Sequence, residues 1–183
     1  MKITRALATS AIGASVILGG TMAGPAQAAD STHGVRAAST TKCHTSTKTF
    51  DLPSKPDITM KATICAKYRG SWGGYRHYMT WLHKVSWDGS WFNPGTRFND
   101  LYFSTRAEHG SDHRGTHEAN DMRSEVNNNS SGSKTFKTGA YAYGVTYVTT
   151  KKKNWTADGY AVYDANNGKG TRTWQLHGTA AVS

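Results

Sequence analysis

Between residues 58 and 68, apolar and polar side chains alternate with a period of two. The apolar set consists of Ile58, Met60, Ala62, Ile64, Ala66 and Tyr68. Successive side chains of a β-strand point to opposite faces, so this pattern predicts a strand with one buried face. Cys65 falls on the other, largely polar face, between Thr63 and Lys67.

Residues 75–87 alternate in the same way. One face would carry Tyr75, His77, Met79, Trp81, His83, Val85 and Trp87, and the other Arg76, Tyr78, Thr80, Leu82, Lys84 and Ser86. The first set is the more apolar, and we interpret it as the face turned to the core. His77 and His83 are then expected to be hydrogen-bonded histidines among large apolar side chains rather than ligands.

The rest of the chain predicts further short strands. Turn residues fill 87–95, a strand follows at 98–105, and residues 106–133 form a polar connector with room for one short helical turn. Two hairpins follow, with tips at 151–154 and 164–170. No long amphipathic helix interrupts the series. The fold class expected is therefore all-β, a single antiparallel, immunoglobulin-like β-sandwich of about seven or eight strands.

The first residues have the pattern of a secretory signal. Lys2 and Arg5 precede an apolar stretch over residues 6–20, and small residues at 26–28 provide a cleavage site. The stretch is shorter than the roughly 20 residues that cross a bilayer, so we expect no membrane span after cleavage. The predicted organisation is a signal peptide over 1–29, a flexible leader over 30–42 and a sandwich domain over 43–183.

Charge narrows the range of partners. The chain of 183 residues carries a formal charge of +10, which falls to +8 once Lys2 and Arg5 are removed with the signal. A secreted basic protein attracts wall polymers, lipid headgroups, extracellular nucleic acid or an acidic protein. The charge is equally compatible with a role in solubility alone.

Two cysteines are present, Cys43 and Cys65. Exported proteins with an even number of cysteines usually pair them, so we predict a disulfide and an extracellular location. Because Cys65 falls on the polar face of its strand, the bond is expected to lie on the outside or edge of a sheet.

The connector holds three histidines four residues apart, His109, His113 and His117, among several acids. Such a set is a candidate for a metal site and, with it, for a metal-dependent hydrolase or nuclease. Gly110 and Gly115 disfavour the helix that would align the three rings. A solvated loop is the simpler interpretation, and we predict no metal, no cofactor and no catalytic residue.

A cationic tip is the main candidate for binding. Lys151, Lys152 and Lys153 stand beside Trp155, a combination that binds anionic polymers through charge and stacking. The alternative is a solvated turn whose lysines discourage edge aggregation. Trp72, Trp87 and Trp91 are candidates for a sugar-stacking surface, although Trp87 also belongs to the core-like alternation of residues 75–87.

The closing hairpin carries the only resemblance to known proteins. The stretches are WTADGY at 155–160, YD at 163–164, NGKG at 167–170 and WQLHG at 174–178. They resemble the C-terminal signature of small exported proteins of high-GC Gram-positive bacteria, a group that includes adaptor subunits of umbrella toxin particles. The resemblance implies an adaptor in bacterial competition that joins a toxin-bearing chain to a lectin subunit. It brings no catalytic residue with it.

Taken together, the sequence predicts a secreted, non-enzymatic module that binds another secreted protein. A metal-dependent hydrolase centred on the three histidines and a binder of anionic wall polymer or nucleic acid are the alternatives.

Overall fold

The computed structural model describes residues 39–52, 55–89, 96–138, 142 and 144–183, and for 116–120 it describes the backbone alone. These residues belong to the compact unit Val35–Ser183. The predicted signal peptide and residues 30–38 of the predicted leader lie outside the described residues. Within the described part, no helix is long and apolar enough to cross a membrane.

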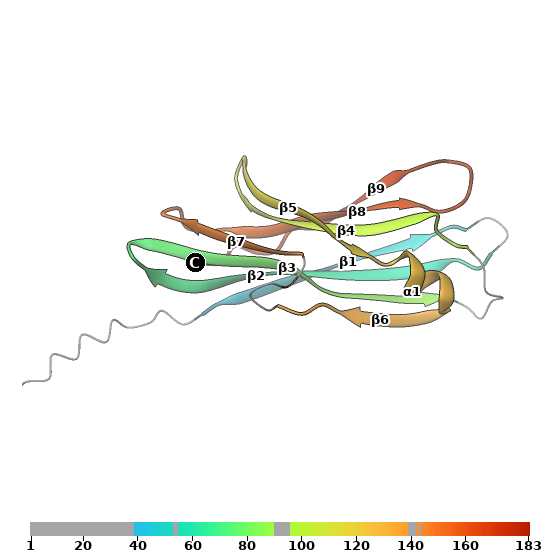
Figure 1. The fold of residues 1–183 in the computed structure, drawn as a ribbon, viewed down its shortest axis with the longest axis horizontal. Helices are drawn as coiled ribbons and strands as arrows, with labels where there is room; N and C mark the ends of the chain where they lie inside the picture. Colours follow the sequence, from blue (N-terminus) through green and yellow to red (C-terminus); the bar gives the residue numbers. More distant parts are fainter. Residues whose placement is uncertain (1–38, 53–54, 90–95, 139–141, 143) are drawn as a thin grey trace, which may run out of the picture. The chain divides into compact units, whose positions relative to one another are not determined.

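The strands form two antiparallel sheets (Figure 1). Sheet A contains β1 (Thr41–Phe50), β2 (Ile58–Trp72) and β3 (Tyr75–Gly89), and both β6 (Ser131–Thr135) and β7 (Val145–Thr150) pair with β3. Sheet B has the order β5 (Asp112–Asp121), β4 (Asp100–His109), β8 (Thr156–Asp164) and β9 (Arg172–Leu176). A single short helix, α1 (Arg123–Asn128), lies among the described residues between β5 and β6.

One apolar core lies between the two sheets. Ile58, Met60 and Val85 enter it from sheet A, whereas Leu101 and Phe103 enter it from sheet B. Burial of apolar side chains from two facing sheets is the main stabilising term of a sandwich. The predicted all-β antiparallel sandwich is confirmed with nine strands in the described residues, and its immunoglobulin-like strand order stays a prediction.

The structure confirms the predicted strand over residues 58–68. Its six apolar residues are all buried in the core, and Cys65 lies on the opposite face. Cys65 bonds Cys43 across the pairing of β2 with the edge strand β1, with 4.1 Å between the Cα atoms. The disulfide is therefore on the outside of sheet A, as its place in the alternation predicts. β1 begins at Thr41, so residues 41 and 42, at the end of the predicted leader, are paired strand.

The prediction of one continuous core face along residues 75–87 is wrong. Thr63 of β2 pairs with Lys84 of β3, but the next residue of β2, Ile64, pairs with Leu82. His83 of β3 is therefore an extra residue with no pairing partner on β2. Such a bulge exchanges the two faces of the strand. Val85 and Trp87 face the core, whereas Met79 and Trp81 lie on the outer face of sheet A.

The bulge also corrects the two histidines of this strand. His83 is exposed. His77 is half-buried and stacks on Trp72, and its Nδ1 lies 3.1 Å from Oγ1 of Thr149. Neither ring lies in the core.

The predicted polar connector over 106–133 is mostly regular structure. Its first half continues β4 and forms a hairpin with β5, and a short helix follows. These residues lack the apolar stripe of an amphipathic helix. An edge strand forms without such a stripe, because backbone pairing with its neighbour and one moderately polar face are sufficient. A single helical turn in this region was expected, and α1 supplies it.

Candidate functional site

The most distinctive surface lies on the outer face of sheet A near the β2–β3 turn. In the strand register, Lys67 of β2, Met79 of β3 and Tyr147 of β7 form one row across the sheet. Trp72 and Tyr75 pair with each other at the end of the hairpin. Gly73 and Gly74 connect them with φ values of 60° and 77°, a conformation typical of tight two-residue turns between antiparallel strands.

We call this surface the aromatic–cation face. It comprises Lys67, Arg69, Trp72, Tyr75, Tyr147 and Lys151. The three aromatic members are the exposed large apolar side chains of the described residues, with exposed fractions of 51% for Trp72, 44% for Tyr75 and 43% for Tyr147. Single exposed aromatic rings are ordinary, but their concentration on one end of one sheet is characteristic of a binding surface.

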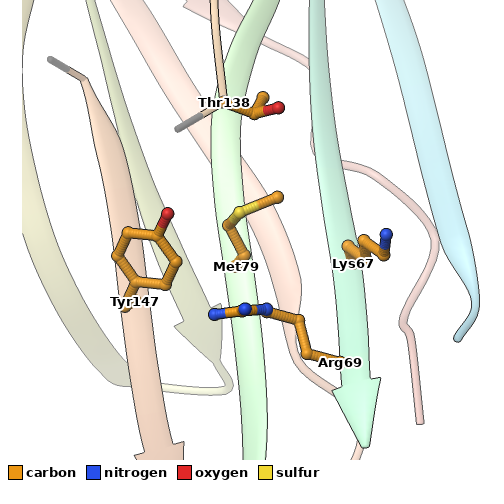
Figure 2. A pocket seen from close by; sticks show the side chains of 5 residues that line it. All are labelled: Lys67, Arg69, Met79, Thr138 and Tyr147. Carbon is orange, nitrogen blue, oxygen red and sulfur yellow. The ribbon is translucent and has the colours of Figure 1, made fainter. Parts of the chain in front are cut away.

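The centre of this face is an open depression of about 430 Å³ lined by Lys67, Arg69, Met79, Thr138 and Tyr147. Figure 2 shows Met79 between Lys67 and Tyr147, the Arg69 side chain reaching from β2 past Met79 toward Tyr147, and Thr138 at the opposite end. Met79 is only 8% exposed and provides an apolar floor. A second, smaller depression of about 170 Å³ on the far side of Tyr147 contains Arg114.

Each exposed ring is held by a neighbour. The guanidinium carbon of Arg69 lies 5.4 Å from the ring centroid of Tyr147, and Nζ of Lys151 lies 5.6 Å from that of Tyr75. Trp72 is parallel to the His77 imidazole, with 3.2 Å between the ring centroids. Cation–π and stacking contacts of this kind orient the rings before a ligand arrives, which reduces the entropy lost on binding.

A bulge places the central cation. Tyr68 pairs with Tyr78 but Gly70 pairs with His77, so Arg69 is an extra residue of β2. A residue at a bulge leaves the regular row of the sheet and is directed differently from its neighbours. The guanidinium thereby reaches across the sheet to β7.

Positive charge dominates the face. No carboxylate of the described residues forms an ion pair with Lys67, Arg69 or Lys151. Beside it, Asp112 already receives hydrogen bonds of 3.0 Å from both Lys152 and Arg114. The hydrogen bond from Lys152, followed by that from Arg114, holds the pKa of the Asp112 carboxyl below its usual value.

In the fold, the lysines of the predicted cationic tip are separated from its tryptophan. Lys151, Lys152 and Lys153 are exposed between β7 and β8, but the neighbouring Trp155 is only 1% exposed. Its ring packs near those of Tyr78 and His109, in the core. Trp155 therefore offers no exposed face for stacking, and the ring that accompanies the lysines is Tyr75.

The three candidate metal ligands lie on the β4–β5 hairpin. His109 faces Trp155, whereas His113 pairs with Glu108 on the neighbouring position of β4, with 3.5 Å between Nδ1 and Oε1. Adjacent strand positions have opposite faces, so these two imidazoles are directed apart. The side chain of His117 lies outside the described residues. Among the described side chains, no group of three or more His, Cys, Asp or Glu is arranged to hold a metal ion.

Of the residues of this face, the sequence singles out Trp72 and Lys151 as binding candidates, whereas it gives no such indication for Lys67, Arg69, Tyr75 and Tyr147. Tyr75 was assigned to the core because of the misread β3 alternation. The usable signal was the Gly73–Gly74 turn, which marks a tight hairpin whose flanking rings must meet. Trp91 lies outside the described residues.

Comparisons with protein families, curated proteins and solved structures find no match to this chain.

Proposed function

We propose that this protein is a non-enzymatic, secreted binding module that docks on another protein through the aromatic–cation face. The observation that supports this most strongly is the composition of the face. Trp, Tyr, Arg and Met are the residues enriched at the centres of protein–protein interfaces. Here Trp72, Tyr75, Tyr147, Arg69 and Met79 lie on the same end of sheet A.

The shape of the surface favours a macromolecule over a small ligand. Small-molecule sites are deep clefts that enclose most of their ligand. The depression beside Tyr147 is open and crossed by the Arg69 side chain. An open depression on a sheet face is better suited to the side chains of a partner.

Export is part of the proposal. The signal-like N-terminus and the Cys43–Cys65 disulfide both support it, because disulfides persist in oxidising compartments. The role as a toxin-particle adaptor that the C-terminal resemblance implies stays a prediction.

The test is recovery of a partner from the organism that makes the protein. The full chain with a C-terminal tag would be expressed in its native host and purified from the culture supernatant under native conditions. We expect a stoichiometric second chain with the wild type and at least a tenfold lower yield of it with Tyr147→Ala or Arg69→Ala.

Two variants on the other sheet serve as matched controls. Tyr160→Ala changes a half-buried tyrosine of β8, and Arg172→Ala changes an exposed arginine of β9. Both should retain the partner. Recovery of the wild type as a bare monomer, or equal loss with the controls, would contradict the proposal.

Binding of an anionic wall polymer or nucleic acid is the second candidate, and the exposed run Lys151, Lys152 and Lys153 favours it. It predicts retention on an anionic polymer that falls steeply with salt. A metal-dependent hydrolase has no comparable support among the described side chains.

A further inference from the structure

Building on the proposed binding role, we propose that the partner docks on the aromatic–cation face through an acidic segment. The segment would be an extended stretch of protein in which every second residue faces the sheet, and these facing residues carry carboxylate and apolar side chains in turn. Carboxylates would meet Lys67, Arg69 and Lys151, and apolar side chains would meet Met79 and the exposed rings.

Charge complementarity is the first support. Lys67, Arg69 and Lys151 have no ion-pair partner among the described carboxylates. The adjacent carboxylate of Asp112 is already held by Lys152 and Arg114. The face therefore retains uncompensated positive charge beside apolar rings. An acidic partner would neutralise this charge when it binds.

The spacing of the surface is the second support. On β3 the outward residues Tyr75, His77 and Met79 are two positions apart, which is about 6.6 Å, so the face is about 13 Å long. An extended peptide has the same side-chain spacing, and about five of its residues span this length. Acidic and apolar side chains that take turns at every second position of such a peptide match a surface on which rings and cations lie side by side.

The contacts of the cations and rings bear on the choice between protein and nucleic acid. Surfaces that bind single-stranded nucleic acid stack bases on aromatic rings in a positively charged groove, and arginine adds cation–π contacts there as well. Here Tyr147 has Arg69 over its ring, Tyr75 has Lys151, and Trp72 has His77. Every exposed ring thus already has a cationic or aromatic neighbour. We favour a protein partner because Arg69, which has no ion-pair partner among the described carboxylates, suits a bidentate carboxylate beside the apolar Met79, and oligo-dT tests the alternative.

The experiment uses the mature protein and three fluorescein-labelled probes. They are a ten-residue peptide with Glu and Tyr in turn at every second position and Ser between them, the same peptide with Gln in place of Glu, and a ten-nucleotide oligo-dT. Binding is measured by fluorescence anisotropy at low salt and at about 0.5 M salt, where exposed charge pairs are screened within roughly 4–5 Å.

We expect the Glu–Tyr peptide to bind at least tenfold more tightly than the Gln–Tyr peptide, and salt to remove most of that difference. Arg69→Gln should weaken the Glu–Tyr peptide about tenfold, since a bidentate charge-assisted contact is lost. Arg172→Gln, on β9, is the matched control and should change binding less than twofold.

Three results would overturn the inference. They are equal affinity for the Glu and Gln peptides, no effect of Arg69→Gln, or tighter binding of oligo-dT than of the Glu–Tyr peptide. These outcomes are separable from the proposed function, which depends on recovery of the native partner. If Tyr147→Ala loses that partner while the two peptides bind alike, the binding face stands and its preference for acid does not.

Discussion

Removal of the Cys43–Cys65 disulfide should destabilise the domain by an amount that follows from its place in the chain. The bond joins residues 22 positions apart on paired strands. In the chain-entropy model a closed loop of this length lowers the entropy of the unfolded state by about 11 cal/mol/K, or about 3.4 kcal/mol at 25 °C. Cys65 is also only 1% exposed, and loss of its buried sulfur adds about 1 kcal/mol.

The double variant Cys43→Ala/Cys65→Ala should therefore lose about 4 kcal/mol of unfolding free energy in urea. For a domain of this size that corresponds to a melting temperature lower by about 10–15 °C. Its m-value should rise, because an unfolded chain without the bond exposes more surface. Reduced wild-type protein keeps both sulfurs and should lose about 3.4 kcal/mol, which separates the loop term from the packing term.

The reasoning fails if the double variant loses less than about 1 kcal/mol, or if reduced wild type matches oxidised wild type. Either result would mean that the unfolded chain already keeps β1 near β2 without the bond. A loss in the double variant with none on reduction would assign the whole effect to packing beside Trp81.

Four further substitutions test the packing and the charges. Trp155→Ala should lower stability by about 3–5 kcal/mol and Trp72→Ala by less than about 1, measured by urea unfolding; similar losses would contradict the core assignment of Trp155. Gly132→Ala places a Cβ 2.6 Å from the buried Trp87 ring and should cost about 1–3 kcal/mol in the same assay. The pKa of Asp112 is lowered by its lysine and arginine neighbours, so its contribution is present above the unfolded pKa and lost as pH falls. The stability difference between wild type and Asp112→Asn should accordingly shrink between about pH 5 and pH 3, and a difference that is independent of pH would contradict the assignment.

The sequence predicted the parts of the fold in which one strand face is clearly apolar and the other clearly polar. Residues 58–68 meet this condition, and both their strand and the outward position of Cys65 are confirmed. The β4–β5 hairpin does not meet it. Edge strands such as β5 are stabilised by backbone hydrogen bonds that composition does not record, so a polar stretch there resembles a loop.

Residues 78–82 explain why the site was harder to predict than the fold. All five are buried. Tyr78 and Leu82 belong to the core between the sheets, and Met79 and Trp81 belong to the cluster on the outer face of sheet A. Because neither face of the strand is exposed here, the sequence pattern does not show which face is turned to the core. A bulge that follows such a run leaves no sign in the hydrophobic pattern. It nevertheless determines on which face of the sheet the preceding residues of the strand lie. The extra residue His83 turns Tyr75 and Met79 outward, and the extra residue Arg69 carries a cation across them. Both irregularities break the register of β2 with β3, and without them the aromatic rings and the cations would not share one face.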